Sequence, residues 1–332
     1  MRIKVLGAGI IGLSVADELL RRGHTVTVVD PAPGTGASYA AAGMLSPSAE
    51  LWHGEEELLR LGRESLALWP EYAGRLGVPL SSLGTVLVGH DAGDLQQVER
   101  QLALLGANSA PAEQLDAAAV AGLEPALGRV RGGALLTDPS VDPRAVVGAL
   151  TARVPVAAVD PGGSHDATVV ATGSRLPAPY QQLVRGVRGE ILRLRSDDAP
   201  HRTVRGWVQG EPVYLVPRAS GEVVVGATTE EHDDPPVVTA GGVLRMLAAV
   251  RALWPALERA ELVEATARDR PGTPDNLPLV GPVADGVVLA AGHYRHGVLL
   301  APLTARLVAD HLETGAVDEA VDPRRLTPGG ER

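Results

Sequence analysis

The sequence predicts an α/β fold with an α+β second domain, in which a discontinuous Rossmann-like domain alternates with an antiparallel-sheet domain. Three observations predict this architecture. The first thirty residues read as strand, glycine-rich turn, helix and second strand. A further buried strand ends in a glycine turn at residues 168–173. Between residues 187 and 267 the pattern changes to short alternating strands separated by turns, which is typical of an antiparallel sheet.

The opening unit has the layout of a dinucleotide-binding site. Residues 3–6 form an apolar strand, residues 13–20 have helical spacing, and residues 24–29 form a second strand. Between the first strand and the helix lies the pattern Gly7-Ala8-Gly9-Ile10-Ile11-Gly12. A lone glycine pattern also fits an ordinary turn, but here every surrounding element is present in order.

Each glycine of this pattern has a physical reason. Gly7 permits a tight turn, Gly9 lets the backbone approach a pyrophosphate, and Gly12 lets the helix lie close to the strands. The helix start at Ile10 and Ile11 offers N–H groups to the phosphates. Asp30 ends the second strand, where a carboxylate accepts hydrogen bonds from ribose hydroxyls and disfavours a 2′-phosphate.

Composition excludes several classes of partner. The net charge of −10 argues against nucleic acid, which favours a basic face. The absence of cysteine excludes disulfides, thiolate nucleophiles and cysteine metal sites, and no acidic or histidine cluster suggests a metal. No stretch approaches the roughly 20 apolar residues of a membrane span. We therefore expect a cytoplasmic protein of two domains, without a membrane or nucleic-acid partner.

A run of small residues follows the opening unit. Residues 36–47 include Ser38, Ala42, Gly43 and Met44, and their side chains are small enough for a bulky ligand to lie against the backbone. The alternative interpretation is the start of a tightly packed alanine helix. Judged alone, the segment does not distinguish the two.

Four motifs in order make the chain similar to the glycine oxidase branch of the D-amino-acid oxidase family of flavoproteins. These are the opening fingerprint, the Ala-Ala-Ala-Gly-Met-Leu run at 40–45, the Arg-Pro-Gly-Thr-Pro-Asp run at 270–275, and the Gly-His-Tyr-Arg-His-Gly run at 292–297. Residues 214–218 and 223–228 also fit. The resemblance extends from residue 3 to about residue 312 and implies FAD, bound without a cysteine tether.

The resemblance also implies which segments and residues hold the cofactor. It assigns 1–82, 134–186 and 265–332 to the FAD-binding domain, and 83–133 and 187–264 to the substrate domain. A short region before the strand at 168–173 leaves Val156 as the residue for the adenine end. The implied cofactor-binding residues are Gly7, Gly9, Ile10, Ile11, Gly12, Asp30, Ser38, Ala42, Gly43, Met44, Val156, Gly173, His293, Tyr294, Arg295, His296, Gly297, Val298 and Leu299.

Substrate binding is expected to need a carboxylate clamp and no catalytic acid or base. Arg270 offers a planar fork that matches a carboxylate, and by resemblance it occupies the clamp position. Arg295 would contact substrate and cofactor, and Tyr214 would donate its hydroxyl from the sheet. Pro212 stands where a relative has histidine, which puts a polar role there in doubt. Pocket size depends on the loops at 50–56 and 230–236.

The expected function is oxidation of glycine, sarcosine or a small D-amino acid with O₂ as acceptor and peroxide as product. The resemblance implies a role in forming the thiazole of thiamine, and relatives are often homo-oligomers. Two alternatives stay open. One is a dehydrogenase of the same fold with another electron acceptor, and the other is a nicotinamide-binding or regulatory module without oxidase chemistry.

Overall fold

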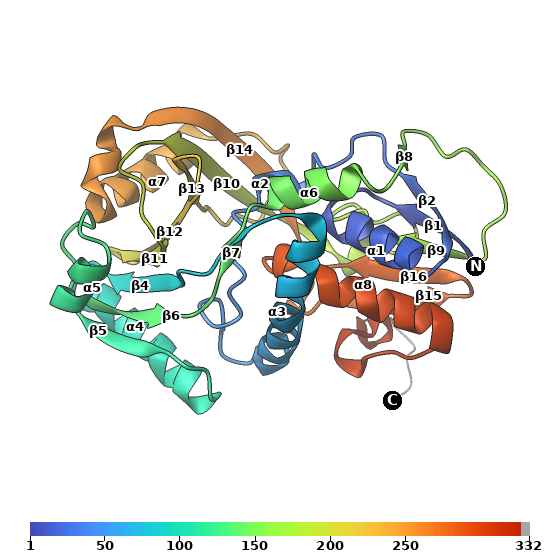
Figure 1. The fold of residues 1–332 in the computed structure, drawn as a ribbon, viewed down its shortest axis with the longest axis horizontal. Helices are drawn as coiled ribbons and strands as arrows, with labels where there is room; N and C mark the ends of the chain where they lie inside the picture. The colour runs from blue at the N-terminus through green and yellow to red at the C-terminus, as the bar shows by residue number, and fades with distance from the viewer. Residues whose placement is uncertain (327–332) are drawn as a thin grey trace.

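The protein, described here over residues 1–326 of a computed structural model, contains two large β-sheets that lie side by side (Figure 1). One sheet is built mainly from the two ends of the chain, and the other from its middle. The helices α2, α3 and α6 lie between the two sheets in Figure 1, at Ala37–Ala40, Glu56–Leu76 and Pro143–Thr151.

The six-stranded sheet has the strand order β15-β16-β9-β1-β2-β8. All neighbours pair in parallel except β15 and β16. The helices α1 and α8 pack against each other beside this sheet, and their leucines and valines share one buried core with it. The elements are β1 Arg2–Leu6, α1 Ile10–Arg21, β2 Thr25–Val29, β8 Val156–Ala157, β9 Ala167–Val170, β15 Leu279–Ala284, β16 Val287–Ala291 and α8 Gly297–Thr314.

This sheet confirms the predicted opening unit. Strand β1 lies between β2 and β9, so the chain leaves β1 through α1 toward one side while β9 lies on the other. In such sheets ligands bind beyond the carboxyl ends of the strands, where the connections diverge. The glycine pattern follows the carboxyl end of β1, at this point of divergence. Helix α6 begins at Pro143, and Asp142 caps it by accepting from the Arg144 N–H at 2.9 Å.

The eight-stranded sheet has the order β14-β10-β13-β12-β11-β4-β6-β5. Its pairs are antiparallel except β11 with β4, so the sheet is mixed. The strands are β4 Thr85–Gly89, β5 Glu113–Asp116, β6 Gly132–Leu136, β10 Arg185–Arg195, β11 Thr203–Val208, β12 Glu211–Pro217, β13 Glu222–Gly226 and β14 Glu261–Gly272. The helices beside it are α4 Ala92–Ala107, α5 Ala117–Leu123 and α7 Ala240–Leu253.

Several predicted placements need correction. Strand β6, assigned with residues 134–186 to the cofactor domain, pairs with β4 and β5 in the eight-stranded sheet. Strand β14 continues in that sheet to Gly272, past the predicted boundary at 265. Residues 240–253 form helix α7 within the stretch read as strands, because tertiary packing buries one face of it on the sheet. The last six residues of the predicted segment 265–332 lie outside the described residues.

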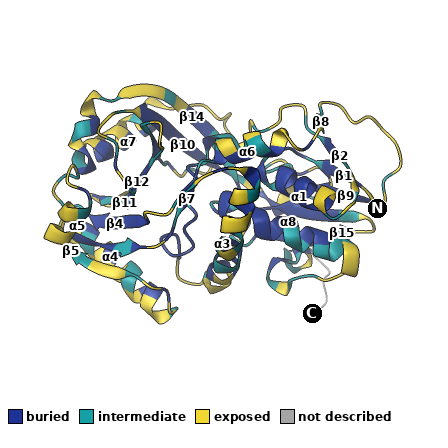
Figure 2. Cartoon of the chain, viewed as in Figure 1, coloured by how far each residue is buried: buried dark blue, intermediate teal, exposed yellow. Residues whose placement is uncertain are grey.

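The two faces of the eight-stranded sheet differ. Alternate residues of β12, including Val213 and Leu215, pack with α7 in one core, while Tyr214 and Val216 point to the opposite face. That opposite face meets the run of small residues before Met44. Figure 2 shows the central strands buried and the outer surfaces of the helices exposed. The sheet therefore presents Tyr214 toward the first domain.

Short elements complete the fold. Strands β3 and β7, at Leu80–Ser81 and Ser140–Val141, pair where the chain passes between the two halves. The 3₁₀ turns are η1 Gln181–Leu183, η2 Pro255–Arg259, η3 Glu319–Val321 and η4 Pro323–Leu326. Within residues 1–326, every helix is too short or too polar to cross a membrane.

Candidate active site

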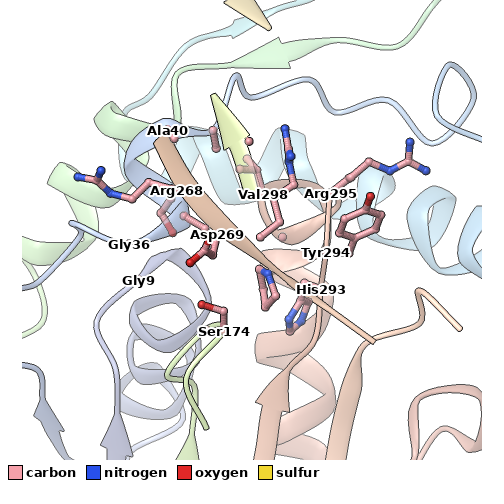
Figure 3. Close-up of a pocket in the computed structure, with 18 of the residues that line it drawn as sticks. Gly9, Gly36, Ala40, Ser174, Arg268, Asp269, His293, Tyr294, Arg295 and Val298 are labelled. Carbon is pink, nitrogen blue, oxygen red and sulfur yellow. The ribbon is translucent and has the colours of Figure 1, made fainter. Parts of the chain in front are cut away.

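One large cavity of about 1420 Å³ extends from the glycine-rich turn of the first sheet to the inner face of the second. Figure 3 shows Gly9, Gly36 and Ser174 toward one end of this pocket and Tyr294 and Arg295 toward the other. This volume exceeds the roughly 300–1,000 Å³ of most small-molecule pockets. It is a size that suits a dinucleotide with a substrate beside it.

The first end of the cavity is made of backbone. A Cβ at Gly12 would overlap the carbonyl oxygen of Gly7, so the start of α1 can lie against the turn only with glycine at position 12, and a Cβ at Gly7 would overlap the Ala171 carbonyl oxygen after β9. The Ile10 N–H donates to the Ser38 hydroxyl at 3.0 Å. The next N–H groups of the first turn of α1 have no partner within the helix, which suits this end to a phosphate.

Asp30 holds this turn in place. Its carboxylate accepts from the Ala8 N–H at 2.6 Å and from the Ala32 N–H at 2.8 Å. Asp30 also lines the cavity, and each carboxylate oxygen keeps a second lone pair. The residue therefore shapes the glycine-rich turn in addition to facing the cavity, a role that the motif alone did not indicate.

The small-residue run forms one wall of the second end. Ala42, Gly43 and Met44 line the cavity, and Gly43 has a φ of +81°. A side chain there would overlap the Val141 carbonyl oxygen and the ring of Pro143. Only four residues, Ala37–Ala40, are helical, so the ligand-wall interpretation fits better than a continuous alanine helix.

Tyr214 of β12 and Arg270 of β14 lie across glycines of the neighbouring strands β13 and β10, in the same eight-stranded sheet. A Cβ at Gly226 would overlap the Tyr214 hydroxyl, and a Cβ at Gly189 would overlap the Arg270 guanidinium. Arg270 also donates to the carbonyl oxygens of Arg188 and Thr228, at 3.3 and 3.2 Å. These contacts fix the plane of the guanidinium while both side chains line the cavity.

Burial controls the protonation of the tyrosine. It raises the pKa of Tyr214 above its ordinary value, and this outweighs the neighbouring Arg270 guanidinium, which lowers it. Tyr214 therefore keeps its proton near neutral pH. A protonated hydroxyl beside a guanidinium forms a pair of donors that suits a carboxylate.

The loop at residues 292–296, just before α8, forms the floor of the second end of the cavity. Tyr294 has a φ of +46°, which turns the chain so that Arg295 faces the cavity. The Nε2 atom of His293 lies 2.8 Å from the Thr304 hydroxyl, and burial lowers the pKa of this histidine to about 3. Burial likewise lowers the pKa of His296 to about 4, against the opposing charge of Glu50. Both rings are therefore neutral at neutral pH. The first N–H groups of α8 have no partner within the helix, and no cationic histidine lies beside them.

Most of the predicted site residues meet in this cavity. All three substrate residues, Tyr214, Arg270 and Arg295, line it, as does Gly173 at the end of β9. Four predicted cofactor residues lie outside the lining: Gly12 packs on Gly7, Val156 and Leu299 pack in the core, and the His296 ring lies beside Glu50. A contact of Val156 with the adenine end of the cofactor stays a prediction.

Sequence reasoning missed four residues of the second end. Glu50, Trp52 and Glu55 come from the loop at 50–56, and Arg205 comes from β11. The loop at 50–56 was expected to influence the size of the pocket, but none of its residues was named, and helix α3 begins only at Glu56. One signal was available for Arg205, because a hairpin with Gln209-Gly210 at its turn pairs it with Tyr214.

The fold and the cavity define a dinucleotide-dependent oxidoreductase. A backbone turn suited to phosphate and a pair of donors suited to a carboxylate open into one cavity, and a nicotinamide-binding motif alone does not explain the second of these. The chain belongs to the DAO family of FAD-dependent oxidoreductases, whose family model matches residues 2–311. This membership removes the nicotinamide-binding alternative.

Named relatives agree with the family. The putative thiamine biosynthesis oxidoreductase ThiO of Rhizobium etli is 38% identical over 95% of this chain and 97% of its own length. The bifunctional protein ThiO/ThiG of Trichormus variabilis is 31% identical over 97% of this chain, which spans 53% of that longer protein. The crystal structure of glycine oxidase from Geobacillus kaustophilus superimposes with a TM-score of 0.87 and 27% identity, covering 100% of this chain and 99% of the other.

The residues present fit FAD. Gly9 lines the cavity, and a Cβ there would have only the Ser38 hydroxyl within 4 Å, so the bare backbone leaves open space for a pyrophosphate. Helix N-termini open into the cavity at both ends, through α1 at Ile10 and through α8 at Gly297 and Val298. One N-terminus suits the pyrophosphate, and the other suits an electron-rich ring.

Proposed function

We propose that this protein oxidises glycine, or a similarly small amine or D-amino acid, to the imine, which hydrolyses to the oxo acid. The observation that carries the proposal is the pairing of Arg270 and Tyr214 over two glycine gaps, in the cavity that also contains the glycine-rich turn. With O₂ as acceptor, glycine, O₂ and water become glyoxylate, ammonia and hydrogen peroxide. The names of the relatives support glycine as substrate and thiamine formation as the purpose.

Each residue has a task in this reaction. Gly9, Ser38 and the start of α1 would hold the pyrophosphate, Asp30 the ribose, and Gly43 with the start of α8 the ring end. When bound, FAD supplies the acceptor of a hydride from the substrate Cα. The N–H groups at Gly297 and Val298 would stabilise negative charge at that end.

Substrate orientation is the main contribution of the second domain. Arg270 binds the substrate carboxylate through its planar fork, and the Tyr214 hydroxyl donates to the same group. This anchoring fixes the Cα relative to the cofactor and replaces a bimolecular encounter by an oriented one. His293 and His296 stay neutral and hold the loop; neither is assigned a proton transfer.

The proposal is tested with purified, FAD-loaded protein. Anaerobic glycine, sarcosine or D-alanine is expected to bleach the visible flavin absorbance, and admission of air should restore it with formation of peroxide. Absence of bleaching with all three substrates would contradict the proposal. Bleaching followed by slow recovery in air would instead favour a dehydrogenase with another acceptor.

A matched pair of variants sharpens the assay. Arg270→Gln should prevent bleaching at glycine concentrations that suffice for the native protein. Arg195→Gln changes an exposed arginine on the same sheet, paired at the surface with Glu261, and should leave the bleaching unchanged. A homo-oligomeric state and a cytoplasmic location stay predictions.

A further inference from the structure

Five charged side chains line the second end of the cavity. Three are the arginines Arg205, Arg270 and Arg295, and two are the glutamates Glu50 and Glu55. A site for one carboxylate requires only one of these cations. The contacts of the remaining four show how their charges are balanced.

Arg205 is paired with Glu50. Arg205 lies opposite Tyr214 in the β11–β12 register, so the two side chains project from the same face of the sheet. Its Nη1 donates to Glu50 Oε1, and the two side chains are only 14% and 10% exposed. Burial would raise the pKa of Glu50, but Arg205 and Arg295 outweigh it and hold that pKa at about 2. The ion pair is therefore fully formed at neutral pH.

Arg295 has the second glutamate as neighbour. Its Nη2 lies 3.8 Å from Glu55 Oε2, and its guanidinium lies 5.3 Å from the centre of the Trp52 ring. Glu55 is held by Asn276, whose amide donates to Oε1 at 2.8 Å. The Oε2 atom of Glu55 is buried and has no hydrogen-bond partner in the described chain.

Arg270 differs from Arg205 and Arg295 because it has no glutamate as ion-pair partner in the described chain. Within residues 1–326 it forms no ion pair with a carboxylate; its Nη1 donates to the backbone carbonyl oxygens of Arg188 and Thr228, and its guanidinium lies beside the Tyr214 hydroxyl. Three cations against two anions leave one positive charge, and the unpaired cation lies beside Tyr214. The charge of the site therefore matches a ligand with a single carboxylate.

We propose that Glu50 determines the charge selectivity of this site by neutralising Arg205, so that substrates with a second anionic group are rejected. The inference rests on the proposed function, because it assumes that the substrate carboxylate binds at Arg270. A second carboxylate on the ligand would meet Glu50 and Glu55, and the guanidinium of Arg205 is already occupied. Like charges brought together in a desolvated pocket cost far more than they do in water.

Removal of the Glu50 charge should convert Arg205 into a site for a second anion. In Glu50→Gln, the ratio of kcat/KM for iminodiacetate to that for sarcosine should rise at least tenfold. These substrates differ by one carboxylate. Arg205→Gln leaves Glu50 uncompensated and should lower the same ratio, and Glu50→Gln/Arg205→Gln should return it toward the native value. Glu57→Gln, at an exposed surface pair, is the control.

Ligand binding provides a readout that does not depend on turnover. Titration of the FAD-loaded protein with acetate and with malonate, followed by the flavin absorbance, gives two dissociation constants. Glu50→Gln should strengthen malonate binding relative to acetate at least tenfold, and Arg205→Gln should weaken it. If Glu50→Gln does not fold, Arg205→Gln alone tests the direction.

The outcomes separate the two proposals. Oxidation of sarcosine by the native protein, with unchanged ratios in all variants, would overturn the charge selectivity and leave the proposed function standing. The expected malonate and acetate shifts without any oxidation of amines would overturn the proposed function and support the selectivity. A uniform loss for mono- and dicarboxylates in Glu50→Gln would assign the residue a structural role only and overturn the inference.

Discussion

The first end of the cavity, proposed to bind the nucleotide, and the second end, proposed to bind the substrate, are built on different principles. At the nucleotide end, consecutive residues of one short segment present backbone N–H groups, with Asp30 and Ser38 holding them. At the substrate end, side chains from β11, β12, β14 and two distant loops converge, and glycines beneath them provide the space. The first end depends on the local conformation of the backbone, whereas the second depends on the register of a sheet.

The largest effect is expected where the backbone of the nucleotide end has no room to adjust. Gly12→Ala places a Cβ against the Gly7 carbonyl oxygen. We expect loss of bound FAD on purification and a destabilisation of about 3 kcal/mol, the upper end of overpacking costs. Flavin content and thermal unfolding measure both.

The control for this variant is another glycine in a helix. Gly148→Ala, in exposed open space on α6, should keep FAD and gain about 0.5–1 kcal/mol from helix propensity. Full flavin content in Gly12→Ala would show that the glycine-rich turn can move to accommodate a Cβ, and would contradict the claim that this backbone has no room to adjust.

A chemical change at the substrate end should affect catalysis and not the cofactor. Arg270→Lys keeps the charge but loses the planar fork. The expected loss is about a hundredfold in kcat/KM for glycine, or about 3 kcal/mol. Steady-state kinetics measure it, and flavin content should equal that of the native protein. Native kinetics in the lysine variant would show that a point charge suffices and that the fork is not used.

A backbone change at the substrate end tests the glycine gaps. Gly189→Ala pushes on the Arg270 guanidinium, which can move because its contacts are side-chain hydrogen bonds. We expect about a tenfold rise in KM with kcat nearly kept, since misplacement weakens the clamp by roughly 1.4 kcal/mol. Gly241→Ala, in open space on α7, is the matched control. An unchanged KM for Gly189→Ala would contradict the role given to the gap.

The smallest expected effect is a pH dependence at the loop that joins the two ends. His293 has a folded pKa of about 3, below the 6.5 of an unfolded histidine, so the unfolded chain binds more protons between these values. Keeping the ring neutral therefore costs no folding free energy above pH 6.5. Below it, the free energy of unfolding falls as the pH decreases from 6.5 toward 3. One histidine accounts for about 1 kcal/mol over the first pH unit.

Urea unfolding at pH 7.5 and 5.5 measures the contribution of His293 to the pH dependence of the free energy of unfolding. The native protein should lose stability between the two pH values, and His293→Gln should reduce the loss by about 1 kcal/mol. His201→Gln, with a side chain 72% exposed, should not change the dependence. An equal loss in the native protein and in His293→Gln would place the titrating group elsewhere.

The opening unit could be predicted because its signals are local. Strand period, glycine spacing and the terminal acid all lie within thirty residues, and β1, α1 and β2 formed as expected. The substrate end could be predicted only in part. Arg270 and Tyr214 were expected through the family resemblance, whereas Glu50 and Arg205 were missed because no local pattern announces an ion pair between residues 155 positions apart.

The sheet to which β6 and β14 belong could not be predicted from the sequence, for a related reason. Strands β6 and β14 have sequences that fit either sheet, and their partners decide which sheet they join. Helix α7 was read as strands because short apolar runs do not separate the two periods. It is helical where its buried face packs on β11 and β12.

The sequence by itself determined the dinucleotide site, because glycines without side chains and a helix N-terminus specify backbone geometry over a few residues. Only the tertiary structure decided the charge of the substrate end. The register of β11 with β12 sets Arg205 beside Tyr214, and the fold of the loop at 50–56 brings Glu50 to it. Electrostatic balance depends on distances between side chains, and distances between remote residues exist only once the chain has folded.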